Sequence, residues 1–160
     1  MPLDVLSQAM VLRWAWGLQA QVRQLREMRV RVLTAALRSG DGRSHTQADN
    51  LPFYDLYCAT HFTVIAAAQL RTALQEFDGD QRLPTGLSSR KIRILRDALE
   101  HWEDDSQYWG KEVARRGVDP TRHVWSHDGS GTIGELVDDE DLLIWANKVY
   151  ADVQAIDRLP

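Results

Sequence analysis

The sequence has few of the residues that mark specialised protein classes. Its single cysteine, Cys58, excludes an intramolecular disulfide and a cysteine-rich zinc site. Five prolines and ten glycines among 160 residues exclude collagen-like and mucin-like chains. No run approaches the ~20 consecutive apolar residues of a membrane span, and Asp4 stands where a signal peptide carries positive charge. We therefore expect no membrane association and a cytoplasmic location.

The remaining composition is that of an ordinary globular chain. Hydrophobic residues make up 44% of the sequence and charged residues 26%, which separates the chain from disordered proteins. Its length is close to that of one domain and allows a core that needs no metal or disulfide. We therefore expect a single domain over 1–160, with no cofactor and no metal.

Apolar residues recur at steps of three and four along four segments, and this spacing predicts helices. The first segment, 3–38, would be about 54 Å long at 1.5 Å per residue. A glycine-containing linker over 39–50 separates it from a bundle core over 51–160. The predicted stripe of the first helix consists of Leu6, Met10, Trp14, Leu18, Val22, Leu25, Met28, Val32 and Ala36.

The bundle core is expected to contain helices at 51–77, 88–116 and 139–159. The first of these is apolar on nearly every side and should lie at the centre, and Ser88 or Ser89 should cap the second. The core residues that the pattern predicts are Phe53, Tyr57, Val64, Ala68 and Phe77, then Ile92, Leu95, Leu99, Trp102, Ser106, Trp109 and Val113, then Leu142, Ala146, Val149, Val153 and Ile156.

The segment 117–137 lacks a helical period and holds three glycines between 129 and 134. It predicts an ordered glycine-rich loop or a short β-hairpin. The fold class we expect is therefore all-α, an antiparallel bundle of four main helices with this loop or hairpin before the last helix.

Charge divides the chain into two unlike parts. Residues 1–96 carry 13 Lys and Arg against 8 Asp and Glu, whereas 97–160 carry 6 against 15. The basic part is almost entirely arginine, which is well suited to phosphate. One interpretation is a nucleic-acid surface. The other is that the two halves fold against each other, or that the arginines form a solvated helix face. A pI of about 5.7 favours the second.

One group of polar residues on the third predicted helix is suited to chemistry. At 100° per residue, Arg96, Asp97, Glu100 and His101 share an arc opposite the apolar stripe. Histidine serves as a general acid or base near neutral pH, and arginine offsets charge on a phosphoryl group. Asp97 precedes His101 by four residues and is placed to orient its imidazole. The other interpretation is an ordinary solvated helix face on which Arg96 pairs with Glu100.

The segment IRILRDALEHWED resembles the signature helix of HEPN (higher eukaryotes and prokaryotes nucleotide-binding) domains, in which a polar residue follows an arginine and a histidine comes four to six intervening positions after that arginine. The resemblance extends over roughly residues 50–158. It implies a metal-independent endoribonuclease of a toxin or antiviral defence system, with Arg96, His101 and Asp97 at a composite dimer site. A subgroup carries a modifiable tyrosine where this chain has Glu103, so regulation of that kind is not implied.

The sequence is therefore compatible with two functions of different classes. In the first, Arg96 and His101 cleave RNA that Arg90 and Arg93 help to bind. In the second, the chain is a non-catalytic HEPN-like bundle that binds a cognate protein or its own copy. The overlong first helix and the resemblance both predict a homodimer, in which Leu18 and Leu25 contact another copy or cover the bundle core.

The remaining histidines and the cysteine give weaker indications of a functional site. His123, His127 and Asp128 have a spacing compatible with a metal ion, but they lie on a loop whose geometry nothing in the sequence fixes. His61 is expected in the core with a hydrogen-bonding partner, and Cys58 is expected to be a small buried side chain.

Overall fold

The computed structural model describes residues 5–39, 51–78, 87–100, 123–125 and 128–156. These residues form four helices, α1 (Val5–Ser39), α2 (Leu51–Asp78), α3 (Ser89–Glu100) and α5 (Asp139–Ile156). They also form a small sheet of β1 (His123–Trp125), β2 (Gly131–Ile133) and β3 (Val137–Asp138). The predicted all-α bundle with a short hairpin before the last helix is confirmed.

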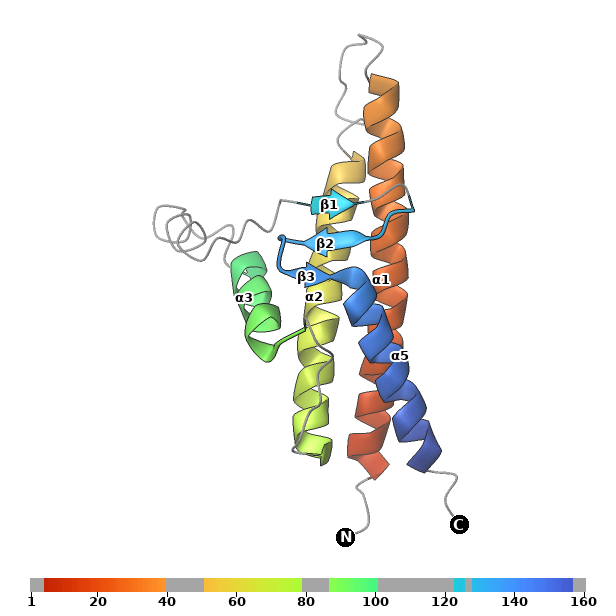
Figure 1. Cartoon of the computed structure of the whole chain (residues 1–160), viewed down its shortest axis with the longest axis vertical. Helices are drawn as coiled ribbons and strands as arrows, with labels where there is room; N and C mark the ends of the chain where they lie inside the picture. Colours follow the sequence, from red (N-terminus) through yellow and green to blue (C-terminus); the bar gives the residue numbers. More distant parts are fainter. Residues whose placement is uncertain (1–4, 40–50, 79–86, 101–122, 126–127, 157–160) are drawn as a thin grey trace.

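The helices run antiparallel to their neighbours (Figure 1). The two long helices α1 and α2 pack along each other, α5 packs on α1, and α3 packs on α2. The C-terminal end of α1 extends beyond the start of α2, while α5 runs from the sheet toward the opposite end of the molecule (Figure 1). Helix α5 therefore does not cover the C-terminal end of α1.

The apolar stripe predicted for α1 is correct from Leu18 to Val32 and wrong at both ends, because Ala36 is exposed as well as the first residues. Four consecutive steps of four residues rotate by about 160° around a helix axis, so Leu6 faces away from the side that buries Val22. Accordingly Leu6 and Met10 are exposed, and Val11 and Ala15 are buried in the core instead. The buried apolar residues of α1 are Val11, Ala15, Leu18, Val22, Leu25, Met28 and Val32.

Helix α2 is buried on the sides that face α1 and α3, but not all round. Val64 and Ala68 lie in the core as predicted, whereas Phe53 is exposed. Cys58 is exposed as well, and its predicted burial is wrong. The physical reason is its position: Tyr54 and Phe62, four residues before and after it, lie on the same outward face and are also exposed.

The start of α3 is capped as the sequence predicts. The backbone N–H of Lys91 donates a hydrogen bond to Ser88 Oγ at 3.2 Å, and the N–H of Ile92 donates to the Ser88 carbonyl at 3.1 Å. The stripe of Ile92, Leu95 and Leu99 is buried, which confirms its predicted phase. The continuation predicted to 116, with Trp102, Ser106, Trp109 and Val113, lies outside the described residues.

The sheet is antiparallel in the order β1–β2–β3. Val124 pairs with Thr132, and Thr132 with Asp138 on the other side. Between β2 and β3 the Leu136 N–H donates to the Ile133 carbonyl at 3.0 Å, and Gly134 and Glu135 both have φ near 56°. Strand β3 leads directly into α5, whose residues Leu142, Ala146, Val149 and Val153 are buried as predicted, with Trp145 beside them.

Candidate functional site

Arg96 lies on the polar side of α3, with 42% of its side chain exposed. Its Nη2 donates a hydrogen bond to Asp97 Oδ1 at 3.1 Å, and its Nε lies 3.5 Å from Glu100 Oε2. The structure therefore brings together two of the three predicted catalytic residues and adds a second carboxylate to them. His101 lies outside the described residues.

The two arginines predicted to bind RNA are both exposed. Arg90 and Arg93 follow one another by three residues in the first half of α3, so they lie on neighbouring parts of its surface. The carboxylates of Asp97 and Glu100 lie in its last turn. Helix α3 thus has a basic first half and a mixed second half, in which the arginine charge is offset locally.

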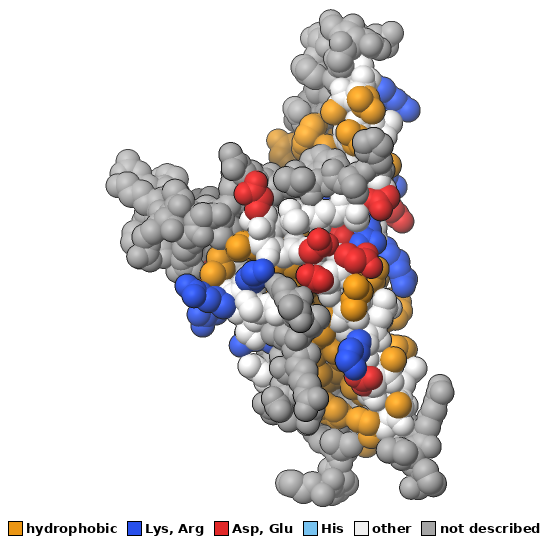
Figure 2. All heavy atoms as spheres, viewed as in Figure 1, with side chains coloured by type: hydrophobic (Ala, Val, Ile, Leu, Met, Phe, Trp, Pro, Cys, Tyr) orange, Lys and Arg blue, Asp and Glu red, His pale blue; other side chains and the backbone are white. Residues whose placement is uncertain are grey.

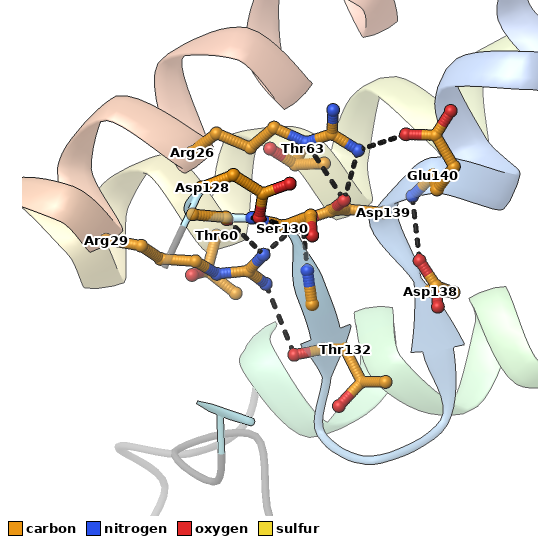
Figure 3. A network of polar contacts seen from close by, with 12 residues as sticks. Arg26, Arg29, Thr60, Thr63, Asp128, Ser130, Thr132, Asp138, Asp139 and Glu140 are labelled. Carbon is orange, nitrogen blue, oxygen red and sulfur yellow. Dashed lines mark hydrogen bonds and ion pairs between the residues drawn. The ribbon is translucent and has the colours of Figure 1, made fainter. Parts of the chain in front are cut away.

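A second polar cluster, which the sequence did not predict, joins α1 to α5 and the sheet. We call it the arginine–aspartate network; it consists of Arg26, Arg29, Asp139 and Glu140 (Figure 3). Arg29 and Asp139 are both 0% exposed and form an ion pair through Nη1 and Oδ2. Asp139 Oδ2 also accepts a hydrogen bond from the Gly131 N–H at 3.1 Å. A buried charge is stable only with such pairing.

Arg26 completes this network from the solvent side. Its Nε and Nη2 donate to Asp139 Oδ1 at 3.0 and 2.6 Å, and Nη2 also reaches Glu140 Oε2 at 2.6 Å. Both oxygens of Asp139 are therefore engaged.

The network also holds the sheet against α1. Arg29 Nη1 donates to the Gly129 carbonyl and Nη2 to the Thr132 carbonyl, each at 3.2 Å. Gly129 has φ of 77°, and a Cβ at this position would lie 2.5 Å from the Arg26 carbonyl oxygen. Only glycine therefore allows the β1–β2 connection to approach the helix this closely.

Burial governs the ionisation of the network. Burial raises the pKa of the Asp139 carboxyl, against the hydrogen bonds and positive charges of Arg26 and Arg29. At Arg29, burial lowers the pKa more than the charge and the hydrogen bond of Asp139 raise it. At Arg26 burial also lowers the pKa, but hydrogen bonds to Glu140 and Asp139 outweigh it and leave the pKa above its usual value. Arginine stays protonated in proteins even so.

The buried part of the arginine–aspartate network is therefore structural. The Asp139 carboxylate is inaccessible to solvent, and side chains and a backbone N–H of this chain occupy both of its oxygens. One signal in the sequence points to it: Arg29 falls four residues after Leu25 and three before Val32, in register with the buried stripe. Its partner is 110 positions away, and no periodicity identifies it.

A shallow hollow of about 400 Å³ lies beside the network and is lined by Arg26, Glu27, Val30, Arg31 and Asp128. Its charged lining has both signs, which selects no one class of ligand. Asp128 Oδ1 accepts hydrogen bonds from Ser130 N at 3.0 Å and Ser130 Oγ at 2.7 Å. Within the described ranges, no three His, Cys, Asp or Glu side chains come together as a metal site requires.

Among the histidines, the structure describes only the side chain of His61. His127 and the side chain of His123 lie outside what the structure describes. His61 is half-buried on α2, with its ring 6.3 Å from Tyr57 and 6.2 Å from Phe62. It is therefore only partly buried, and not in the core as the sequence predicts.

Several large apolar side chains lie in solvent instead of in the core. Trp16 on α1 is 62% exposed, Phe62 on α2 is 55% exposed and Ile144 on α5 is 51% exposed. Val30, Leu37, Phe53 and Tyr54 are exposed as well. No helix in the described part of the chain combines the length and apolar character that a membrane span requires. Exposed apolar side chains of this kind form binding surfaces where they lie together in one patch.

No protein-family model, curated protein or solved structure matches the chain.

Proposed function

We propose that this chain is a non-catalytic helical-bundle module that binds another protein or a second copy of itself. The observation that carries the proposal is the state of Arg96. Its guanidinium is engaged by Asp97 and Glu100 of its own helix, the arrangement expected of a solvated helix face. A phosphate would have to displace two carboxylates, and their negative charge repels RNA.

The exposed apolar side chains support the same proposal. Trp16 on α1, Phe62 on α2 and Ile144 on α5 are each more than half exposed. Aromatic and aliphatic side chains in solvent provide the apolar centre of a protein interface. The proposal therefore accounts for a feature that an isolated bundle does not need.

The test combines two measurements on the full-length chain. Incubation with single-stranded RNA in chelator should give no cleavage above that of an Arg96→Ala variant. Chemical cross-linking and sedimentation should detect association of the chain with itself or with an added candidate partner. Substitution of Trp16, Phe62 or Ile144 by serine should weaken that association without lowering thermal stability. Loss of stability in all three variants, with association unchanged, would contradict the proposal.

A second candidate is the HEPN-like endoribonuclease, and the placement of two residues favours it. Arg96 and Asp97 both lie outside the buried apolar stripe of α3, as the resemblance expects of the arginine and the polar residue of the site. In this candidate His101 acts as general acid and base while the ribose 2′-hydroxyl attacks the adjacent phosphate. Arg96 offsets the phosphoryl charge, Asp97 orients the histidine, and Arg90 and Arg93 hold the RNA backbone.

The ribonuclease candidate has a separate test. Cleavage should persist in chelator, leave a cyclic phosphate end, and fall by about 10²–10⁴-fold in a His101→Ala variant. Arg96→Ala should reduce it by about 10²–10³-fold. Equal cleavage by the parent and the His101→Ala variant would identify a contaminating nuclease and overturn this candidate.

A further inference from the structure

The first half of α1 is apolar on its outward side as well as on its buried side. From Val5 to Val22 the helix contains one charged residue, Arg13, and two of its glutamines, Gln8 and Gln19, are buried. Such a sequence is typical of a helix that is covered on all sides. The described part of the chain covers one side of it and leaves the other in solvent.

The uncovered side forms one continuous surface. We call it the α1 outer face; it consists of Val5, Leu6, Ala9, Arg13, Trp16, Ala20 and Arg23. All but the half-buried Ala20 are exposed, and the exposed fraction reaches 78% at Val5 and 69% at Leu6. At 100° per residue these positions fall within an arc of about 100°, so they point the same way. The buried residues of this stretch lie on the opposite side of the helix.

The charge on the α1 outer face has one sign. Helix α1 has no acidic residue from Val5 to Arg26, whereas the face carries Arg13 and Arg23. Neither guanidinium forms an ion pair within the described ranges. Most of the acidic side chains visible in Figure 2 gather where α5 meets the sheet, away from the first half of α1 (Figure 1). Further along α5, Asp152 is paired with Lys148.

The position of Arg13 argues against a second copy as the partner. The face extends about 27 Å from Val5 to Arg23 at 1.5 Å per residue, and Arg13 lies close to its middle. Ala9 and Trp16 follow it about one turn away on either side. Two copies that dock through this face place a two-fold axis near its middle, which brings the two Arg13 side chains together. Like charges at the centre of an apolar contact oppose association.

A carboxylate within an apolar surface fits the α1 outer face instead. A lipid membrane does not fit, because a helix lying in the membrane interface keeps its charged side chains away from the acyl chains, whereas Arg13 lies among apolar residues. The face is straight and one helix wide, which is the shape along which a second helix packs. On that helix, carboxylates about 15 Å apart match Arg13 and Arg23, which are separated by ten residues of 1.5 Å each.

We propose that the α1 outer face binds an amphipathic helix of another protein, one whose apolar stripe contains acidic residues. The proposal rests on the module function proposed above and names the chemistry of its partner. Val5, Leu6 and Trp16 form the apolar contacts, and an aromatic side chain that loses its water on binding provides much of the affinity. Arg13 and Arg23 pair with the carboxylates and fix the register of the bound helix.

The exposed apolar residues of α2 have no such features. Tyr54, Cys58 and Phe62 form an outward face, but they include no charge that selects an occupant. This face therefore provides a control surface for the experiment.

The experiment measures the binding of defined peptides to the full chain by fluorescence anisotropy. The probe is a labelled helical peptide of about 21 residues, long enough at 1.5 Å per residue to cover the face. It has leucines at alternating steps of three and four, and two of these positions, ten apart, hold glutamate. Companion peptides hold glutamine or lysine there. We expect the glutamate peptide to bind about tenfold or more tightly than the glutamine peptide, and the lysine peptide to bind least.

Variants of the chain locate the binding surface. Arg13→Glu with Arg23→Glu should weaken the glutamate peptide about tenfold or more and should make the lysine peptide the tightest of the three. Trp16→Ser should weaken all three peptides. Two controls, Arg90→Glu with Arg93→Glu on α3 and Phe62→Ser on α2, should bind as the parent does. Circular dichroism verifies that each variant keeps its helices.

Several outcomes would overturn the proposal. One is that the three peptides bind equally, or that none binds; another is that the controls weaken binding as much as the α1 variants do. The proposal also fails if the α1 variants abolish self-association measured by sedimentation, or binding to phosphatidylglycerol vesicles, while the glutamate peptide does not compete. The partner of this face is then a second copy or a lipid.

Failure of this proposal differs from failure of the module function. A chain that binds none of the peptides, cleaves no RNA and still associates through Phe62 or Ile144 overturns the acidic helical partner alone. Cleavage of RNA that depends on Arg96 overturns the module function, whichever peptide binds.

Discussion

Arg29 and Asp139 form an ion pair in which neither side chain is exposed to solvent. They lie 110 positions apart, one near the end of the first helix and the other at the start of the last. The pair is the centre of a network that fixes α1, the sheet and α5 relative to one another. Its removal provides the most direct test of what holds this bundle together.

An Asp139→Asn variant should be strongly destabilised. The amide cannot balance the charge of Arg29, which would remain buried without an anionic partner, at a cost of about 3–5 kcal/mol. Urea unfolding followed by circular dichroism measures the change. The control is Asp152→Asn, which removes the exposed pair with Lys148 and should change stability by less than about 1 kcal/mol. Similar values for the two variants would show that the buried pair contributes little.

Two glycines should respond to the same substitution with opposite signs. Gly129→Ala forces a Cβ against the Arg26 carbonyl at a positive φ, and we expect a loss of about 1–3 kcal/mol. Gly17→Ala lies within α1 with no atom within 4 Å of the new Cβ, so the higher helix propensity of alanine should add about 0.5–1 kcal/mol. Thermal unfolding of the two variants measures both changes in stability. A gain in stability at both positions would contradict the close approach at Gly129.

Glu135 has φ of 56° in the turn between β2 and β3, which is uncommon for a residue with a side chain. Glu135→Gly removes the Cβ that makes this conformation unfavourable, and we expect a gain of about 0.5–1 kcal/mol. The midpoint of chemical unfolding measures it. A loss instead would mean that the glutamate side chain stabilises the turn by more than its backbone strain.

The exposure of Cys58 predicts its reactivity. In the folded protein one thiol per chain should react with a disulfide reagent, because Cys58 is the single cysteine and lies at the surface. The rate should be within about tenfold of that of the unfolded chain, since access is not restricted. Reaction only after addition of denaturant would contradict the exposed position.

The sequence predicts the helices of this fold well where a short stripe fixes the buried side. In α3, Ile92, Leu95 and Leu99 define the core face correctly because three residues in two turns leave little room for drift. In α1 the same reasoning is wrong at Leu6, because small errors in phase accumulate along a 35-residue helix. Local spacing therefore predicts that a segment is helical. Its prediction of which side of the helix is buried becomes less accurate as the helix gets longer.

The polar contacts differ more sharply in whether the sequence predicts them. The contact of Arg96 with Glu100 follows from their i,i+4 spacing and was one of two interpretations of the sequence. The pairing of Arg29 with Asp139 has no local signal, because it depends on how α5 returns to α1. Cys58 illustrates the same limit: an apolar helix sequence does not indicate which side its neighbours will cover.

The pairing of Arg29 with Asp139 also sets an order of events during synthesis. A chain is made from its N-terminus, so α1 and α2 exist in full before Asp139 has been added. Until then the guanidinium of Arg29 has no carboxylate to allow its burial, and the part of α1 around it must remain hydrated. Helices α1 and α2 can therefore pack around Leu18 and Leu25 first. The part of α1 around Arg29 becomes buried only after α5 has been synthesised and packs on it.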